Sequence, residues 1–185
     1  VKTTLPYFIP IFFPGMIHFG TMGAVIRTKS PIPSRRALLY IGAMGPISGF
    51  IVSLIAVIIG ISLSEIKPIP VPLPDTVIPI FGDSLLFKAI VMLIHGRIPQ
   101  GYDIYLSPYA WAGWIGLLIT SLNLMPLGQL DGSHILYALL GRKQAVIGWV
   151  AFFSLIIMSF IWFGWTIWIV LTLIILMVAH PPVPE

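Results

Sequence analysis

Apolar residues are concentrated in three long runs, and these runs predict the helices of the fold. Ala37–Leu63 contains no charged residue. Because about 20 apolar residues cross the hydrocarbon core of a bilayer, this run predicts a membrane-spanning helix. Tyr109–Leu140 predicts a second crossing. Gln144–Pro184 also lacks charge, but a helix over residues 146–178 would measure about 50 Å, which is too long for one crossing. We expect Gly164 to break it into a hairpin, although a single strongly tilted helix also fits.

The second run is interrupted by the polar sequence NLMPLGQLDGSH, residues 123–134. The part before the interruption would form about 21 Å of helix, which is too short to cross a membrane alone. Ile135–Leu140 completes the crossing and would bring Arg142 and Lys143 to the side of the basic residues that precede the first run. Broken helices at membrane depth are tolerated only where they face protein or a water-filled cavity. The pattern therefore predicts one interrupted helix around residues 123–132.

Other segments favour extended or short structures. Residues 1–16 carry three prolines, which remove backbone donors and disfavour helix, so we expect an extended segment at the membrane surface. The alternation within residues 20–27 predicts a strand. The prolines of residues 68–74 favour a polyproline-like path, and Leu85–His95 predicts a short interfacial helix. The predicted fold is mainly α-helical, a multi-spanning membrane helical bundle with a short N-terminal β-strand or hairpin, in one domain.

The composition supports a membrane protein. Hydrophobic residues make up 58% of the chain and charged residues 9%, whereas soluble domains carry about 25% charged residues. The net charge of +4 does not indicate nucleic-acid binding, because most cations flank apolar runs, as the positive-inside rule describes. The chain has no cysteine, which excludes disulfides and thiolate metal sites. We expect an integral, multi-pass membrane protein in contact with the lipid bilayer.

Asp131 is the clearest candidate for a functional residue. A carboxylate at membrane depth costs several kcal/mol unless it is paired, hydrated or metal-bound, so such a residue suggests a functional site. Asp-Gly is also a common turn pair, and Asp is a favoured helix N-cap, so a cap at the interface is an open alternative. His134 would share a helix face with Asp131 and could help to hold a metal, but two ligands are too few for zinc, and a hydrogen-bonded interfacial histidine is the preferred interpretation. The remaining histidines, expected in loops, are His18, His95 and His180.

Five stretches follow one another along the chain: FGTMGAVIRTKS (residues 19–30), AMGPISGF (43–50), WAGWIGLLITSL (111–122), NLMPLGQLDG (123–132) and the terminal HPP (180–182). In order and spacing they resemble motifs of the site-2 protease family of intramembrane zinc metalloproteases. The resemblance is closest to the plant-chloroplast and prokaryotic branch of that family. Together the stretches extend over most of the chain.

The resemblance implies roles for particular residues. In that family, two histidines of an HExxH helix and one aspartate hold Zn²⁺, and by motif position the aspartate is Asp131. The metal lowers the pKa of a bound water, and the HExxH glutamate acts as general base. Asn123 would lie beside the site and orient substrate or stabilise the oxyanion. The N-terminal strand would bind an unwound substrate by strand addition. Its substrate-binding residues would be Gly20, Thr21, Met22 and Gly23.

The sequence departs from the family in one respect, since residues 1–185 contain neither HExxH nor His-x-x-x-His. In the family this motif precedes the segment that matches residues 1–15, so we expect the HExxH part to have been lost by truncation. We therefore expect the core of an intramembrane zinc metalloprotease, inactive alone, whose whole form cleaves transmembrane or membrane-proximal peptides of membrane proteins. Its location would be a cytoplasmic membrane in a prokaryote, or a chloroplast membrane.

Two other functions stay open at this point. One is a transporter or channel with an ion site at Asp131 and His134, because broken helices around a midplane site are common in such proteins. Transporters usually carry a second, paired broken segment, and none is evident in the sequence. The other is a catalytically dead relative that binds substrates or partners. The presence or absence of HExxH in the upstream coding sequence separates a protease from a dead scaffold. The pattern does not indicate an oligomeric state.

Overall fold

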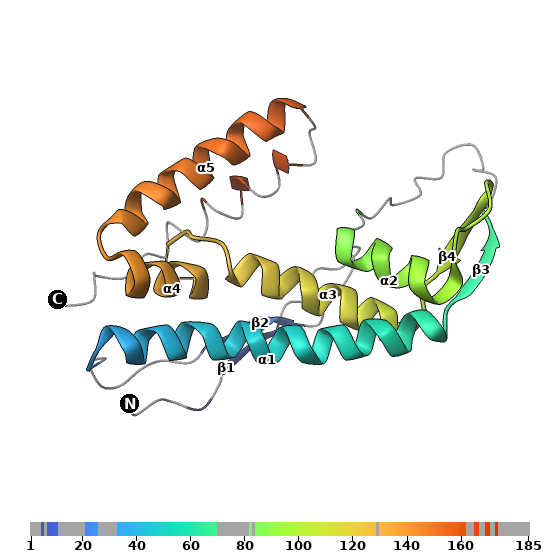
Figure 1. Ribbon diagram of the computed structural model, residues 1–185, viewed down its shortest axis with the longest axis horizontal. Coiled ribbons are helices and arrows are strands. Elements are labelled where there is room, and N and C mark those ends of the chain that lie inside the picture. Colours follow the sequence, from blue (N-terminus) through green and yellow to red (C-terminus); the bar gives the residue numbers. More distant parts are fainter. Residues whose placement is uncertain are drawn as a thin grey trace.

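The computed structural model describes residues 5, 7–10, 21–25, 33–69, 82, 84–128, 130–161, 165–166, 169–170 and 173. This part of the chain is mainly helical and includes two small antiparallel sheets (Figure 1). In chain order the elements are β1 (Tyr7–Pro10), β2 (Thr21–Val25), α1 (Arg35–Ser62), β3 (Glu65–Pro68), α2 (Leu85–His95), β4 (Tyr102–Tyr105), α3 (Pro108–Asn123), α4 (Asp131–Leu140) and α5 (Lys143–Ile161).

The long helix α1 confirms the first predicted apolar helix. It begins after Ser34, whose Oγ accepts a hydrogen bond from the backbone N–H of Ala37 at 3.2 Å, as expected of an N-cap. Its 28 residues correspond to about 42 Å of helix. The helix continues through Pro46 without ending (Figure 1). It therefore provides one long surface on which other elements pack.

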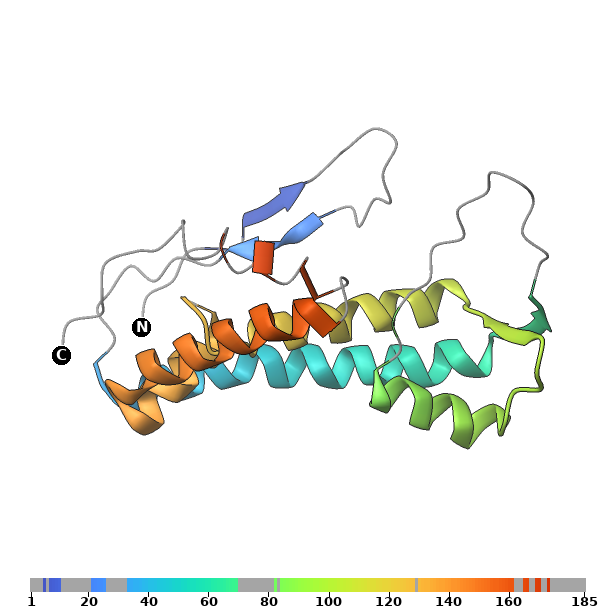
Figure 2. The ribbon, with the colours of Figure 1, turned by 90° about the horizontal axis from the view of Figure 1, so that it is seen from above.

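Small residues on one side of α1 let α3 and α4 approach closely. A Cβ atom on Gly60 would overlap the backbone nitrogen of Ala110, at the start of α3. Further along, a Cβ on Gly49 would lie 3.1 Å from Oγ1 of Thr120, near the end of α3. Since α1 and α3 meet in this reversed order, they are antiparallel, and α4 continues the path of α3 toward the start of α1 (Figure 2). In the sequence, Gly45 and Gly49 lie four residues apart in the apolar run, a spacing that predicts the close approach of a second helix, and the structure confirms it.

The start of α1 and the end of α4 lie together. Cζ of Arg35 is 5.9 Å from the ring centroid of Tyr137. The guanidinium group also lies beside the α4–α5 turn, where a Cβ on Gly141 would be 3.6 Å from Nη1 of Arg35. The interrupted α3–α4 segment thus brings Arg142 and Lys143 to the end of the molecule where the basic start of α1 lies, as predicted.

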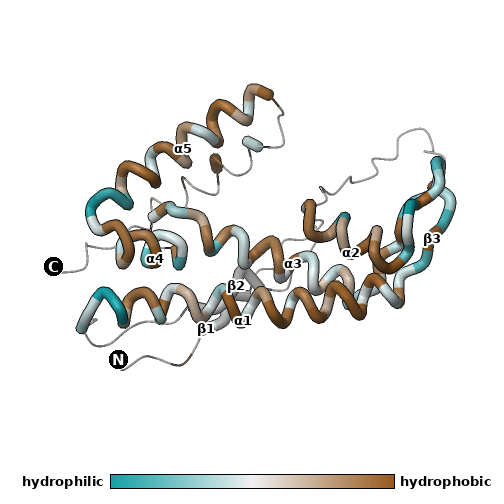
Figure 3. The backbone as a smooth tube through the Cα atoms, in the orientation of Figure 1, coloured by the Kyte–Doolittle hydropathy of each residue, from teal (hydrophilic) through white to brown (hydrophobic). Residues whose placement is uncertain are grey.

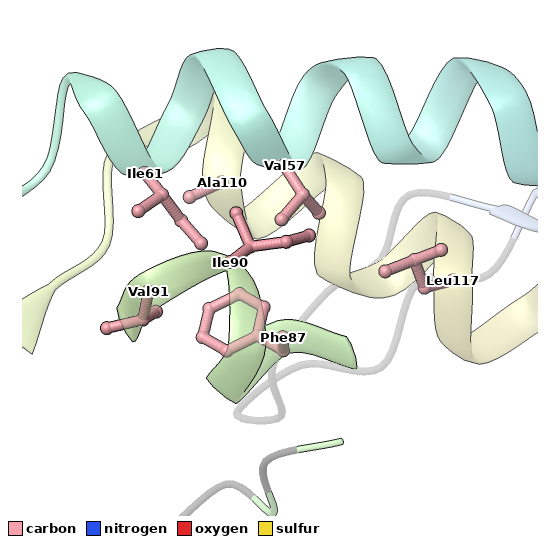
Figure 4. Close-up of a cluster of buried hydrophobic side chains, with 7 residues drawn as sticks. All are labelled: Val57, Ile61, Phe87, Ile90, Val91, Ala110 and Leu117. Atoms are coloured by element: carbon pink, nitrogen blue, oxygen red, sulfur yellow. The ribbon is translucent and has the colours of Figure 1, made fainter. Parts of the chain in front are cut away.

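The apolar core lies at the opposite end of α1, where α2 packs against α1 and α3. Figure 4 shows its side chains converging from these three helices. Its buried members are Val57, Ile61, Phe87, Ile90, Val91, Ala110 and Leu117. The predicted helix over Leu85–His95 is confirmed, but the prediction that His95 lies in a loop is wrong. His95 ends α2, and its Nε2 lies 2.8 Å from the carbonyl oxygen of Ile61, which joins the two helix ends.

The β3–β4 ribbon was not predicted. The two strands pair antiparallel, with Glu65 opposite Tyr105 and Pro68 opposite Tyr102. The sequence suggested only a proline-rich loop, because a pairing between short segments so far apart leaves no local signature. Within β3 the ammonium of Lys67 hydrogen-bonds the Glu65 carboxylate at 2.7 Å, which lowers the pKa of Glu65 and raises that of Lys67. Both side chains are exposed, so the pair contributes little to stability.

In the part of the chain that the structure describes, two helices, α1 and α5, are long and apolar enough to cross a membrane. Within the most apolar 18 residues of each helix, 28% are buried in α1 and 11% in α5. Neither helix therefore resembles the core helix of a soluble protein, which is mostly buried. Hydrophilic residues gather at the start of α1, at the α4–α5 turn and in β3, with long apolar stretches between them (Figure 3). The exposed apolar surface is what a lipid environment requires.

Several predictions lie wholly or partly outside the described residues. These include the break at Gly164, the loop positions of His18 and His180, and most of the polyproline-like path over residues 68–74. The predicted N-terminal β-hairpin is confirmed where it is described, because β1 and β2 pair antiparallel with Tyr7 opposite Val25.

Candidate functional site

The predicted interruption of the helical run over residues 109–140 is confirmed. The helix α3 ends at Asn123 and α4 begins at Asp131. Pro126 cannot continue a hydrogen-bonded helix, and Gly128 has a φ of +55°, a conformation that glycine adopts without strain. The chain therefore leaves the helical path for a short loop and becomes helical again at Asp131.

Asp131 does not act as the N-cap of α4. The capping position belongs to Leu130, which has extended backbone angles and whose carbonyl oxygen accepts hydrogen bonds from the N–H groups of Ser133 and His134. Asp131 is the first helical residue, where the positive end of the helix dipole favours an anion. Its side chain is half-buried. Within the described part of the chain, no donor hydrogen-bonds this carboxylate.

Three glycines determine where the carboxylate lies. Oδ2 of Asp131 would be 3.5 Å from a Cβ on Gly45, so the side chain lies along α1. A Cβ on Gly42 would be 3.0 Å from the Asp131 carbonyl oxygen and 3.1 Å from Cβ of His134. A Cβ on Gly132 would overlap the carbonyl oxygen of Leu124 at the end of α3. The first turn of α4 is thus wedged between α1 and the end of α3.

Sequence reasoning identified part of this arrangement. It assigned Gly45 to a helix contact without naming Asp131 as the group on the other side, and it did not single out Gly42 or Gly132. The signal for Gly42 was available, because it lies three residues before Gly45 on the same face of an apolar helix. For Gly132, the sequence indicated only a turn at the Asp-Gly pair and no contact with another helix.

The other predicted site residues are distributed over two regions. Asn123 is half-buried and ends α3, so it lies at the opposite end of the break from Asp131. His134 is one turn after Asp131 and lies against Gly42. Thr21, Met22 and Gly23 belong to β2, whereas Gly20 lies outside the described residues. Among the described residues, α4 packs mainly against α1 and α5 rather than against β2.

The hairpin leaves one edge of β2 available. The pairing of β2 with β1 places Thr21 opposite Pro10 and Ala24 opposite Phe8. Among the described residues the sheet has two strands, so the second edge of β2 has no partner strand there. An unpaired strand edge can accept another extended chain through backbone hydrogen bonds.

The donor set fits one ligand of a metal site rather than a complete site. The carboxylate of Asp131 is half-buried and receives no hydrogen bond from the described residues, and a cation would compensate such a group. However, no group of three His, Cys, Asp or Glu that could hold a metal ion exists in the described ranges. Since a zinc site takes at least three protein ligands, these residues alone do not hold zinc.

Comparison with known proteins gives a consistent family assignment. The model of peptidase family M50 matches residues 5–163. "Probable zinc metalloprotease EGY2, chloroplastic" of Arabidopsis thaliana is 34% identical over 146 residues, which cover 78% of this chain and 25% of the relative. "Probable zinc metalloprotease EGY1, chloroplastic" of Oryza sativa subsp. japonica is 32% identical over 149 residues, 80% of this chain and 25% of the relative. The chain therefore spans about a quarter of the length of these relatives. No solved structure matches it.

Proposed function

Because this chain belongs to peptidase family M50, the site-2 protease family, we propose that it forms the core of an intramembrane zinc metalloprotease. The observation that carries the proposal is the position of Asp131. Its carboxylate is half-buried at a helix break, lies along α1 beside Gly45 and receives no hydrogen bond from the described residues. A bound cation would compensate such a carboxylate.

In this proposal Asp131 is one of three protein ligands of Zn²⁺. The other two are the histidines of an HExxH helix, which residues 1–185 do not contain. A zinc ion held by these three ligands would supply the Lewis-acid activation of water that peptide hydrolysis needs. Asn123, at the other end of the break, orients the substrate carbonyl or donates to the oxyanion. Without the HExxH ligands and their glutamate, residues 1–185 alone do not cleave peptides.

The proposed setting is a membrane. In this arrangement α1 and α5 each cross the bilayer and α3 with α4 forms one interrupted crossing, so that residues 1–185 make one multi-spanning, membrane-embedded domain. The apolar exposed surfaces of α1 and α5 support this. The relatives are named chloroplastic, which supports a chloroplast membrane as the location. The proposed substrates are membrane proteins cut within or beside their transmembrane segments.

The zinc content of the purified full-length gene product tests the assignment. We expect about one zinc per molecule in the native protein and a large loss in Asp131→Asn, because asparagine retains the shape of the side chain but lacks the anionic ligand. Metal analysis by mass spectrometry after dialysis measures both. Undiminished zinc in the variant refutes the assignment, and ion flux in liposomes by a zinc-free protein would favour a transporter.

The unpaired edge of β2 is the proposed substrate-binding edge. We expect a photo-crosslinking amino acid at Met22 to capture a transmembrane peptide substrate, because an unwound substrate would add to this strand through its backbone. The same probe at Tyr102, in the separate β3–β4 sheet, is the matched control. Mass spectrometry of the adducts identifies the attachment site. Equal capture from both positions would contradict a specific substrate edge.

A further inference from the structure

The helix α5 touches the segment that carries Asp131 on both sides of the carboxylate. After it, Nε2 of Gln144 donates a hydrogen bond to Oγ of Ser133 at 2.7 Å. Before it, Gly148 lies against the break loop so closely that a Cβ there would be 2.8 Å from the carbonyl oxygen of Pro126. Both contacting residues belong to the first part of α5, which passes over the break in two views (Figures 1 and 2).

The Gln144–Ser133 hydrogen bond acts on the first turn of α4. Ser133 is buried, with 6% of its surface exposed, and lies two residues after Asp131. A buried hydroxyl that loses its partner carries a desolvation penalty of about 1–3 kcal/mol. The turn at Gly141, which has a φ of +57°, reverses the chain between α4 and α5. That reversal is what lets a residue of α5 reach back to the first turn of α4.

The Gly148 contact acts on the break loop itself. The described residues of this loop, 124–128 and 130, are not helical, and Pro126 has no backbone N–H to contribute. A cavity of about 250 Å³ remains between the loop and α5, lined in part by Leu127 and Trp149. The loop therefore has space into which it could shift. The close backbone approach at Gly148 is a point at which it is held.

We propose that Gln144 and Gly148 are positioning residues for the metal ligand Asp131, acting from α5 through Ser133 and Pro126. This rests on the proposed function and extends it to a helix that sequence reasoning assigned only to crossing the membrane. By holding both flanks of Pro126–Ser133, α5 keeps the carboxylate beside Gly45 before any cation binds. The ligand would then be preorganised for binding. Loss of contacts that orient a metal ligand without touching the metal lowers metal affinity by about 10–100-fold.

The test measures metal affinity and ligand geometry in the full-length gene product in detergent. We expect Gln144→Leu, which removes the amide at similar volume, to weaken Zn²⁺ binding about 10-fold or more in chelator competition. The visible absorption of the Co²⁺-substituted protein should also change, because it reports the arrangement of the ligands. The matched control is Gln100→Leu in an exposed turn, which should change neither quantity.

Two further variants test through which contacts α5 influences zinc binding at Asp131. Ser133→Ala removes the other partner of the hydrogen bond and should weaken zinc binding similarly, and the double variant should be no worse than either single variant. Gly148→Ala should weaken binding independently by displacing the loop, with Gly82→Ala as control because nothing lies within 4 Å of a Cβ there. If Gln144→Leu does not fold, as judged by circular dichroism, Ser133→Ala and Gly148→Ala decide the question.

The outcomes separate this inference from the proposed function. Variants that lower the unfolding temperature but leave zinc affinity and the Co²⁺ spectrum unchanged would show that α5 only packs against the loop. If Asp131→Asn loses zinc while the α5 variants do not, the inference fails and the function stands. If Asp131→Asn keeps its zinc, the function fails as well.

Discussion

Replacement of Asp131 by asparagine is expected to reduce peptide cleavage by the full-length gene product more than about 100-fold. Even residues that merely orient metal ligands are worth about 10–100-fold, and this change removes a ligand itself. The amide occupies nearly the same volume, and Leu130 rather than Asp131 caps α4, so the helix should be retained. Cleavage of a transmembrane peptide substrate in liposomes, followed by mass spectrometry, measures the effect.

Asp103→Asn is the matched control for this change. Asp103 lies in β4, is exposed, and its Oδ1 accepts a hydrogen bond from the backbone N–H of Ile104, a role that the amide oxygen of asparagine can also fill. Cleavage should be unchanged in this variant. Equal loss in both variants would point to a general effect of reduced charge, and full activity in Asp131→Asn would remove the basis of the proposed zinc site.

Gly60→Ala is expected to destabilise the folded protein by about 2–3 kcal/mol, toward the upper end of the range for overpacking. The added Cβ would overlap the backbone of Tyr109 and Ala110. Backbone atoms cannot move aside as a flexible side chain can, so the start of α3 would have to separate from α1. The free energy of unfolding in detergent, measured by circular dichroism during titration with a denaturing detergent, reports the change.

Two other glycines provide graded controls. Gly49→Ala places its Cβ 3.1 Å from Oγ1 of Thr120, and a shift of a few tenths of an ångström by that side chain suffices, so we expect a much smaller effect. Gly82→Ala meets nothing within 4 Å and should be close to neutral. Equal destabilisation by all three substitutions would show that loss of glycine itself matters, rather than the α1–α3 contact.

The site depends on the same close packing that stabilises the helices. Gly60 and Gly49 bring α3 against α1, and after the break Gly45 and Gly42 receive the first turn of α4. Because α4 is short, its position depends on these contacts and on α5 rather than on its own length. A carboxylate on an isolated interrupted helix would not keep a fixed place relative to ligands on another helix.

Much of the helical structure was predictable from local pattern. The uncharged run that became α1, the short helix α2 and the interruption between Asn123 and Asp131 all follow from apolar length and from Pro126 and Gly128. The β3–β4 pairing was not predictable in this way, because its strands are separated by the whole of α2. The resemblance of the motifs to the site-2 protease family is confirmed by the family match over residues 5–163.

By itself, the sequence determined that the chain is mainly helical, that its long apolar helices suit a lipid environment and that one helix breaks before an aspartate. These properties depend on residues close together in the chain, through apolar length and turn chemistry. Only the tertiary structure decided that Leu130 rather than Asp131 caps α4, that the carboxylate lies beside Gly45, and that Gln144 reaches back to Ser133. The cap depends on the exact backbone angles at the break, which the residue types do not specify. The other two relations join residues that are apart in sequence, and they depend on how closely α1, α4 and α5 pack.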